Sequence, residues 1–397
     1  MSKGQDTIIA MANQGGGARG PFQVGSYAAI QEEGYCPTVF SGISIGAMNS
    51  AIMAGNKPEE RLAKLRSFWK TISRHASRSA GKASGDWLTT MYPWLEFTKP
   101  FLTGEPNVFG MPVPMWTDAF YAWHHMIGAA SAVWFGQPNF FQARKIPPFM
   151  AQPGTEEATS WYTTAPLRQT LIDHVDFDLI NAKSSKVRLF LGAVKVKSGK
   201  MVWFDNEQTE ITPEHVMASG ALPPGFPGVR IDGDLYWDGG CHTNTAIDVI
   251  LQNVREQALH IFMPILFSTE GDEPRTMQEV ERRVKDIRFG SHSTYIVEKM
   301  RESHDLQSDL QQVLDELHIH APAAVKKFAN LLERGRTHQR TITTVEYESP
   351  DYETALNDAD FDPVSLERRE AAGYKAMKRQ LAELAKCTKK HEPHITL

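Results

Sequence analysis

The N-terminal part of the chain alternates short apolar runs with helix-like segments. Residues 7–12 and 39–41 are short apolar runs, and a glycine-containing turn follows each of them. Runs this short are typical of strands that are buried on both faces of a parallel sheet. A helix is predicted after each strand, at residues 21–30, with proline in the first turn, and at residues 47–54. The pattern therefore favours an α/β fold with a mostly parallel sheet.

Residues 87–161 are rich in aromatic, methionine, proline and glycine residues. Because the spacing of the apolar positions is irregular, we expect short helices joined by proline-containing loops, and no sheet, in this segment. The segment is predicted to be an insertion, at about residues 80–165, that forms a cap over the core. Its aromatic side chains either pack the cap, or some of them line an acyl-chain pocket or touch a membrane interface, because aromatic rings suit both kinds of role.

Strand signals return after the aromatic segment. Residues 187–196 and 200–204 are joined by Lys197-Ser198-Gly199, which predicts a β-hairpin. The pattern then predicts a short helix, two strands around an Asp-Gly turn, another helix and a buried strand, at residues 213–219, 229–237, 246–257 and 259–267 respectively.

The chain changes character again near residue 270. Three charged, helix-prone segments and one candidate strand follow: residues 277–289, 294–317, 364–385 and 340–348. Charged helix faces are most simply explained as solvated surface. The sequence therefore predicts a main domain at residues 1–270 and a mainly helical C-terminal extension at residues 271–397.

Composition and charge narrow the class of protein. The 397 residues are 41% hydrophobic and 22% charged, with a net charge of −5, which is typical of a globular protein and gives no reason to expect nucleic-acid binding. No apolar run reaches the length of about 18 residues that a membrane-spanning helix needs, and the N-terminus lacks a secretory-signal pattern. Cys36, Cys241 and Cys387 have no metal-ligand spacing and cannot all pair. We expect a cytoplasmic protein without metal or cofactor, in contact with membranes only peripherally.

A glycine-rich loop stands between the first predicted strand and the first predicted helix. It reads Gly15-Gly16-Gly17-Ala18-Arg19-Gly20. Glycines in such a place leave backbone N–H groups bare and directed outward, so that the turn holds an anion or a developing oxyanion. The loop also has the Gly-x-Gly-x-x-Gly spacing of dinucleotide-binding turns. It lacks the Lys-Ser/Thr ending of a P-loop, however, and no acidic residue ends a second strand about twenty residues later.

A serine between glycines follows the second predicted strand at once, in the stretch Gly42-Ile43-Ser44-Ile45-Gly46. A serine hydroxyl is a weak nucleophile, which needs exposure, a base and donors for an oxyanion. Glycines on both sides allow a sharp turn that lifts the serine out of the strand at the mouth of a helix. Strand, turn and helix together indicate a nucleophile elbow with Ser44 as the nucleophile.

Two kinds of base could activate Ser44. In a triad, a histidine takes the proton and a carboxylate orients the histidine. His242 is the best-placed histidine, although a surface or supporting role suits it better. In a dyad, a carboxylate contacts the serine directly. Asp238 fits the dyad because it follows an apolar strand end and precedes two glycines, which let the backbone approach the site closely.

Three motifs in this order resemble the signatures of the patatin-like phospholipase family: the loop from Gly15 to Gly20, the turn from Gly42 to Gly46, and Asp238-Gly239-Gly240. The resemblance covers roughly residues 7–270 and makes residues 1–270 the catalytic domain. It implies a three-layer α/β/α fold with a mostly parallel central sheet. The charged tail is similar to the C-terminal extension of a bacterial subgroup of the family.

The resemblance also implies roles for individual residues. Ser44 is the nucleophile, and Asp238 is the base that activates it without histidine. The backbone N–H groups of Gly16 and Gly17, with Ala18 as a third candidate, form the oxyanion hole. The implied reaction is hydrolysis of a fatty-acyl ester of a phospholipid or lysophospholipid through an acyl-enzyme, with no metal.

Further residues have supporting roles in the family pattern: Gly15, Arg19, Gly42, Gly46, Gly239 and Gly240. Arg19 matches the family's basic position, where it either holds the loop by binding carbonyl groups or helps a phosphate or oxyanion electrostatically. The resemblance implies no role for Cys241 or His242, which stand where members of the family vary.

Other functions stay open on the sequence. The substrate could instead be a neutral short-chain ester, an acyl thioester or a storage-polyester oligomer. A non-catalytic module is the other class, in which the glycine loop binds a nucleotide or the chain binds lipid with a vestigial dyad. Clear stabilisation by NAD or ATP in a thermal-shift titration would favour the binding module.

Overall fold

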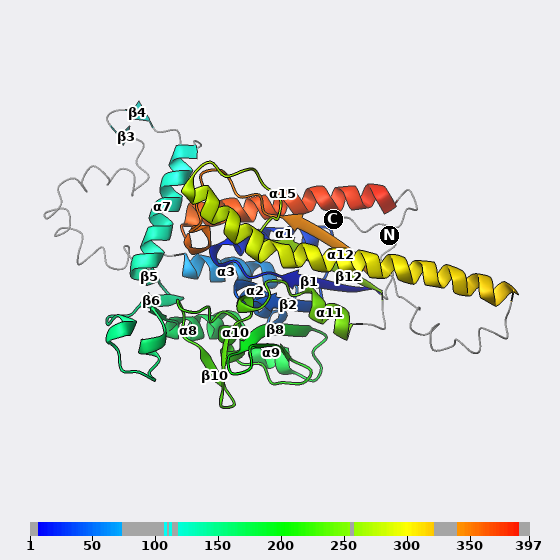
Figure 1. Ribbon diagram of the computed structural model, residues 1–397, viewed down its shortest axis with the longest axis horizontal. Helices are drawn as coiled ribbons and strands as arrows, with labels where there is room; N and C mark the ends of the chain where they lie inside the picture. Colours follow the sequence, from blue (N-terminus) through cyan, green and yellow to red (C-terminus); the bar gives the residue numbers. More distant parts are fainter. Residues whose placement is uncertain are drawn as a thin grey trace.

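An eight-stranded sheet forms the centre of the computed structural model, which describes residues 7–73, 107–108, 111–112, 118–254, 258–320 and 340–388. The strand order is β10-β11-β8-β2-β1-β12-β13, with β9 paired to β8 (Figure 1). The strands are β1 (Ile8–Asn13), β2 (Val39–Ile43), β8 (Arg188–Lys195), β9 (Lys200–Asp205), β10 (Val229–Ile231), β11 (Asp234–Asp238), β12 (Leu259–Ile265) and β13 (Arg340–Glu346).

The middle of the sheet is parallel. β1 pairs in parallel with β2 and β12, β2 pairs in parallel with β8, and β12 pairs in parallel with β13. The antiparallel pairs lie at one side of the sheet, where β9 and β11 pair with β8 and β10 pairs with β11. Asn13 at the end of β1 lies opposite Gly42 in β2. The glycine loop and the serine turn therefore leave the sheet side by side at the same edge.

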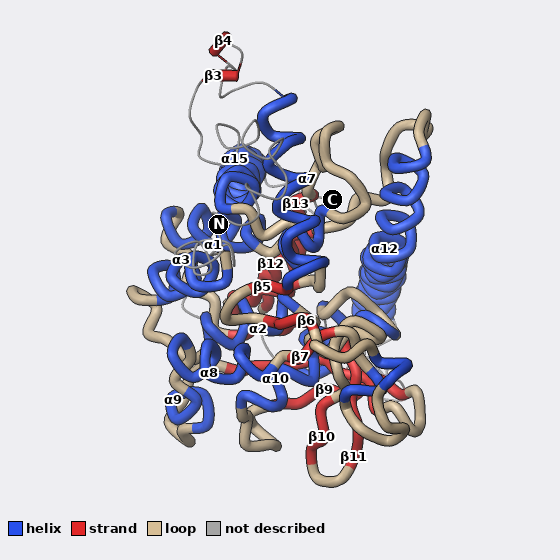
Figure 2. Tube along the Cα trace, turned by 90° about the vertical axis from the view of Figure 1, so that its left-hand side faces the viewer, coloured by secondary structure: helices blue, strands red, loops and turns tan. Residues whose placement is uncertain are grey.

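Helices cover both faces of the sheet (Figure 2). One face carries α1 (Pro21–Glu32), α2 (Ile45–Ala54), α3 (Arg61–Ile72), α8 (Ala165–His174), α9 (Phe177–Asn181), α10 (Pro213–Ser219) and α15 (Pro363–Thr388), and the other carries α11 (Ile247–Asn253) and α12 (Met277–His320). Met11 belongs to the first core and its neighbour Ala10 to the second, as the alternation along a strand requires. The expected three-layer α/β/α fold is confirmed. Among the helices of the described ranges, none is both long and apolar enough to cross a bilayer.

Most of the elements predicted from the pattern are confirmed. The hairpin is β8 with β9, and the strands around the Asp-Gly turn are β10 with β11. Two charged segments that we predicted separately form one helix, α12. Gly290 stands between the two segments, and the helix continues through it. The helix passes close to the core at this point, because a Cβ atom at Gly290 would be 2.5 Å from the carbonyl oxygen of Phe267.

The prediction for the aromatic segment is right in part within the residues that the structure describes. Short 3-10 helices are present at Pro148–Met150 and Glu157–Thr159, but the long helix α7 (Asp118–Phe135) was not expected. A three-stranded sheet and a two-stranded ladder are also present: β5 (Gly136–Gln137), β6 (Phe141–Ala143) and β7 (Tyr162–Thr163), and β3 (Asn107–Val108) with β4 (Met111–Pro112). Strands of two or three residues are too short to leave an alternating pattern. The predictions for residues 74–106 lie outside the described residues.

The C-terminal segment is built into the same sheet and core. β13 extends the sheet beside β12, and α15 packs along α1 (Figure 1). Two glycines allow the helices to approach closely. A Cβ atom at Gly25 would lie 1.8 Å from the carbonyl oxygen of Glu370, and one at Gly373 would lie 2.0 Å from that of Phe22. The segments on either side of residue 270 therefore share one hydrophobic core.

The substitution Gly373→Val should destabilise the fold strongly. The added side chain would strike the backbone of α1 at Phe22, and overpacking typically costs about 1–3 kcal/mol, or more where backbone must move. Ala372→Val is the matched control, because Ala372 is exposed on the same helix and should lose only helix propensity, less than about 1 kcal/mol. Thermal unfolding measures both variants, and equal melting temperatures would contradict the close packing of the two helices.

Candidate active site

Ser44 occupies a sharp turn between β2 and α2. Its φ of 56° lies in the left-handed region, which residues with a side chain seldom adopt. A Cβ atom at Gly42 would lie 2.3 Å from the carbonyl oxygen of Gly46, and one at Gly46 would lie 2.4 Å from that of Asn13. Only glycine fits at these two positions, so the strained serine has the geometry of a nucleophile elbow.

The backbone of the serine turn is held by Ser219, at the end of α10. The N–H of Ser44 donates both to the carbonyl oxygen of Ser219 and to its Oγ, each at 3.1 Å. Ser219 Oγ in turn donates to the carbonyl oxygen of Gly192 in β8 (2.6 Å). Ser219 therefore anchors the turn to the sheet. The sequence contains no signal for this role beyond the end of a predicted helix.

The glycine loop lies against the serine turn. A Cβ atom at Gly15 would be 2.9 Å from Cβ of Ser44 and 2.7 Å from Oδ1 of Asn244. Gly17 has a φ of +54°, and a Cβ atom there would lie 2.3 Å from the carbonyl oxygen of Asp358. These positions require glycine, because any side chain would push the loop away from Ser44.

Hydrogen bonds fix the peptide groups of the loop. Five consecutive carbonyl oxygens are acceptors: that of Gln14 from Gln23 Nε2 (2.8 Å), Gly15 from Asn244 Nδ2 (3.0 Å), Gly16 from the N–H of Arg19 (3.1 Å), Gly17 from the N–H of Gly20 (3.0 Å) and Ala18 from Arg369 Nη1 (3.0 Å). Within the described part of the chain, the N–H groups of Gly16 and Gly17 donate to no other group. Since N–H and C=O point in opposite directions in a trans peptide, the bound carbonyls direct these two bare amides toward the cavity that both glycines line.

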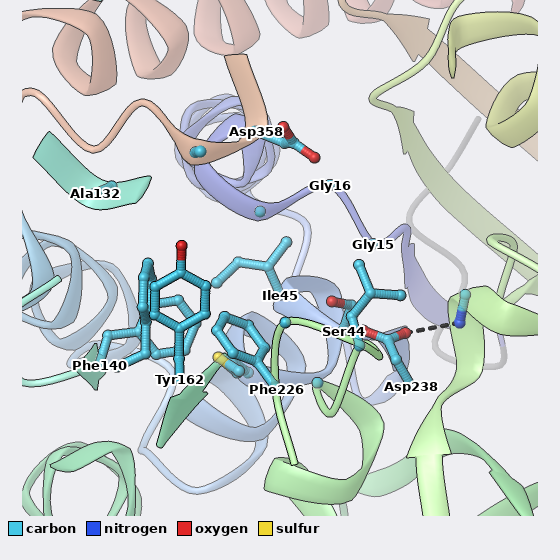
Figure 3. Close-up of a pocket in the computed structure, with 18 of the residues that line it drawn as sticks. Gly15, Gly16, Ser44, Ile45, Ala132, Phe140, Tyr162, Phe226, Asp238 and Asp358 are labelled. Atoms are coloured by element: carbon cyan, nitrogen blue, oxygen red, sulfur yellow. Dashed lines mark hydrogen bonds between the residues drawn. The ribbon is translucent and has the colours of Figure 1, made fainter. Parts of the chain in front are cut away.

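Asp238 lies beside Ser44 at the end of β11 (Figure 3). Its carboxyl group is buried, and Oδ1 accepts a hydrogen bond from the N–H of Gly240 (2.7 Å). Oδ2 is buried and has no hydrogen-bond partner within the residues that the structure describes. Burial raises the pKa of Asp238 to about 7, although the hydroxyl of Ser44 and the N–H of Gly240 act in the opposite direction. The carboxyl therefore lies where the serine hydroxyl interacts with it, and it titrates near neutral pH.

The loop after Asp238 packs against β8 and the glycine loop. A Cβ atom at Gly239 would lie 2.7 Å from the carbonyl oxygen of Gly192, so the turn depends on glycine. Asn244 follows in the same loop, where its Nδ2 donates to Gly15 as described above. Asn244 thus connects the aspartate loop to the glycine loop. Sequence reasoning missed it, because a single asparagine in an irregular loop is no signal by itself.

Ser44, Asp238 and the glycine loop open onto one cavity of ≈ 330 Å³. Aromatic side chains make up much of the wall, among them Phe140, Phe141, Tyr162, Phe226, Phe267, Phe289 and Phe361. In Figure 3, Phe140 and Tyr162 lie across from Ser44 and Asp238, and Phe226 lies between the two groups. The cavity therefore combines a reactive polar end with an apolar wall, which suits a substrate with a hydrocarbon chain.

The remaining candidates lie outside the cavity wall. Arg19 is buried, and its Nη1 donates to the carbonyl oxygen of Leu266 (2.6 Å) and binds Asp286 (2.9 Å). Cys241 and His242 are exposed, although partial desolvation of the Cys241 thiol, together with the nearby charge of Asp238, raises the pKa of the thiol to about 11. Within the described ranges, no group of histidine, cysteine and acidic side chains has a metal-binding arrangement.

The arrangement has the parts of a nucleophilic acyl transfer: a strained serine, a carboxyl that can take its proton and two bare amides where an oxyanion would form.

Two family models match the chain. The model described as patatin-like phospholipase matches residues 11–251, and one described as patatin phospholipase matches residues 287–393. The sequence matches no curated protein.

Two solved structures are similar over most of the chain. The structure of VipD from Legionella pneumophila is 12% identical, with a TM-score of 0.38, and the match covers 96% of this chain and 67% of that one. The structure of full-length SpcU in complex with full-length ExoU, from the type III secretion system of Pseudomonas aeruginosa, is 13% identical with a TM-score of 0.25, and the match covers 95% and 73%. Similarity at this level supports no inference about activity.

Replacing Asp238 with asparagine should stabilise the fold at pH 8. The pKa of this carboxyl is about 7 in the folded chain against an ordinary 3.8, so between these values the folded state holds a proton that the unfolded state has released. Stability therefore falls as the pH rises from about 4 to about 7. Asp238→Asn removes this loss, on the order of a few kcal/mol.

Thermal unfolding at pH 5 and pH 8 measures this effect. The melting temperature of Asp238→Asn should exceed that of the unmodified protein at pH 8 by more than it does at pH 5. Asp232→Asn makes the same change at an exposed turn and serves as the control. A pH-independent difference for Asp238→Asn would contradict the raised pKa.

Proposed function

Because the chain belongs to the patatin-like phospholipase family, we propose that it hydrolyses fatty-acyl esters of phospholipids or lysophospholipids. Ser44 is the nucleophile of the proposed reaction, and Asp238 is the base. One observation carries the proposal: the strained serine, the buried carboxyl beside it, and the amides of Gly16 and Gly17, which donate to no other described group, open onto the same cavity.

In the acylation step, Ser44 Oγ attacks the acyl carbonyl carbon while its proton passes to Asp238. The carbonyl oxygen becomes an oxyanion and accepts hydrogen bonds from the N–H groups of Gly16 and Gly17, with Ala18 as a third candidate donor. The intermediate then collapses, the ester bond to the alcohol breaks, and Asp238 gives its proton to the leaving oxygen. Losing one such donor typically slows catalysis about 100- to 1000-fold. A side chain at Gly16 or Gly17 would shift the loop and so misplace these donors.

In the deacylation step, Asp238 takes a proton from water as the water oxygen attacks the acyl-enzyme. Collapse of the second intermediate releases the fatty acid, and the proton returns to Ser44 Oγ. A base with a pKa of about 7 can accept a proton and return it at neutral pH with little cost in free energy in either direction. The rate should accordingly rise as the pH increases through about 7.

Exposed apolar side chains beside the cavity support peripheral contact with a lipid surface. Val133 and Leu222 line the cavity and are about two-fifths exposed, which places the mouth between the end of α7 and the loop after α10. Trp134 and Phe135 follow Val133 directly, and both are mostly exposed.

The connection between β6 and β7 extends this apolar surface. It contains exposed Phe149, Met150 and Trp161. It is joined to the cavity mouth because the hydroxyl of Tyr162 donates to the carbonyl oxygen of Val133 (2.6 Å) and the N–H of Trp161 donates to that of Pro224 (3.1 Å). Apolar side chains gathered at a substrate entrance are typical of proteins that bind a membrane interface. We call Trp134, Phe135, Phe149, Met150 and Trp161 the apolar rim.

The nucleophile is tested by labelling with a fluorophosphonate probe, followed by peptide mapping. The adduct should form on Ser44, and Ser44→Ala should lose both labelling and release of fatty acid from phosphatidylcholine and lysophosphatidylcholine, by at least about 1000-fold. Ser67→Ala is the control, because Ser67 lies on the exposed face of α3. An adduct on another serine, or undiminished hydrolysis by Ser44→Ala, would refute the proposal. Activity confined to p-nitrophenyl esters or thioesters would identify a different acyl substrate.

The lipid surface is tested with the double variant Trp134→Ala/Phe149→Ala. Removing two exposed aromatic side chains should weaken binding to phosphatidylcholine vesicles at least about tenfold, since burial of one large apolar side chain contributes about 1.5–3 kcal/mol. Cleavage of a soluble short-chain ester should not change. Tyr295→Ala removes an aromatic side chain that is also exposed but lies on α12. If this control weakens vesicle binding equally, the apolar rim is not the docking surface.

A further inference from the structure

The C-terminal segment holds the glycine loop directly. Arg369, on α15, donates from Nη1 to the carbonyl oxygen of Ala18 (3.0 Å). On the other side of the sheet, Ser293 of α12 accepts a hydrogen bond from Nε2 of Gln14. Both contacts are buried, and both end on the loop whose amides face the cavity. Two helices that follow the predicted catalytic domain in sequence therefore hold its glycine loop.

The contact at Ala18 is transmitted to an oxyanion donor through two peptide groups. The carbonyl of Ala18 and the N–H of Arg19 belong to one peptide, and that N–H donates to the carbonyl oxygen of Gly16 (3.1 Å). The carbonyl of Gly16 shares its peptide with the N–H of Gly17. Because each peptide is planar and trans, fixing the carbonyl of Ala18 fixes the direction of the N–H of Gly17.

Arg369 is itself held rigidly. Its side chain is buried, and Nε and Nη2 both donate to Oε1 of Glu353 (3.0 and 2.8 Å), while Nη2 also contacts Oδ2 of Asp360 (3.2 Å). Glu353 accepts a further hydrogen bond from the hydroxyl of Tyr347 (2.7 Å), and Asp360 binds Nδ1 of His125 in α7 (2.9 Å). A planar guanidinium bound to two carboxylates has little freedom to turn. Nη1 of Arg369, which donates to the carbonyl oxygen of Ala18, is therefore held in a fixed position.

The loop also packs against the backbone near Asp358. The carbonyl oxygen of Asp358 lies where a Cβ atom of Gly17 would be, at 2.3 Å. Asp358 belongs to the same stretch as Asp360, which binds Arg369. The backbone near Asp358 and the anchored guanidinium therefore both contact the loop, and the bond from Arg369 to Asp360 connects them to each other.

We propose that Arg369 is a positioning residue for the oxyanion hole, and that the C-terminal segment serves as a clamp on the glycine loop. The inference rests on the proposed function, because it assigns the loop amides to an oxyanion. The clamp acts on the transition state, since the amides bind the oxyanion more strongly than the ground-state carbonyl. Loosening it should lower kcat and leave KM for the ester unchanged.

Arg369→Lys tests the clamp, because lysine keeps the positive charge between Glu353 and Asp360 but cannot reproduce the planar set of donors. Arg61→Lys is the matched control. Arg61 is equally buried, and it also donates to two backbone carbonyl oxygens, those of Asn56 (3.2 Å) and Pro37 (2.8 Å), away from the cavity. Steady-state hydrolysis of lysophosphatidylcholine, the rate of fluorophosphonate labelling, the pH profile and thermal unfolding are measured for each variant.

Arg369→Lys should lower kcat and the labelling rate about 10- to 100-fold, as expected for a misplaced rather than a deleted donor. Its KM and the apparent pKa of its rate profile should match those of the unmodified protein, because Asp238 is untouched. Arg61→Lys should lower the melting temperature without this loss of kcat. Equal losses of kcat in the two variants, or no loss in Arg369→Lys, would overturn the positioning role.

If Arg369→Lys does not fold, Ser293→Ala tests the same clamp at Gln14. The lost hydrogen bond should reduce kcat roughly two- to tenfold at unchanged KM, and an unchanged kcat would overturn the clamp. The proposed function is judged separately, by the unmodified protein. Absence of labelling at Ser44 there would refute the function, whereas normal labelling with no effect of either clamp variant would refute only the clamp.

Discussion

The glycine loop, together with Gln14 before it, is the constraint on which the rest of the site depends. Five consecutive carbonyl oxygens from Gln14 to Ala18 are bound, two by N–H groups of the loop itself and three by the side chains of Gln23, Asn244 and Arg369. Those bonds turn the amides of Gly16 and Gly17 toward the cavity, where they lie near Ser44. Parallel pairing of β1 with β2 brings the loop and the serine turn to one edge of the sheet. The fold thus places the proposed oxyanion donors and the proposed nucleophile together before any substrate binds.

The proposed base shows how function and stability oppose each other here. The carboxyl of Asp238 is buried, and one of its oxygens has no hydrogen-bond partner among the described residues, which is unfavourable for a charged group. Burial raises its pKa to about 7, so the same feature that weakens the fold at high pH suits a base that works near neutrality. The strained φ of Ser44 is a second local cost. The sheet, which is buried on both faces, and the tightly packed helices stabilise the fold enough to offset both unfavourable features.

Local patterns were enough to predict the parallel sheet and the sharp turn at Ser44, and to find the three motifs. Strands, glycine turns and the helices after them are encoded by neighbouring residues. Patterns did not reveal Ser219, Asn244 or Arg369. Arg369 and Ala18 are 351 positions apart, and a contact of that kind leaves no trace in periodicity or spacing. The cap was also misjudged, since β5, β6 and β7 have only two or three residues each. The charged helices and the candidate strand of the tail were predicted, but the pattern did not show that the strand joins the central sheet or that α15 packs against α1.

A crystal structure of the fluorophosphonate adduct is the most direct test of the central claim that the glycine loop and Ser44 form one acyl-transfer site. The account predicts a bond from Ser44 Oγ to phosphorus, with a phosphoryl oxygen about 3 Å from the backbone nitrogens of Gly16 and Gly17. Arg369 should remain bound to the carbonyl of Ala18 in that structure. A phosphoryl oxygen that faces solvent or another group, with the two amides unoccupied, would contradict the account.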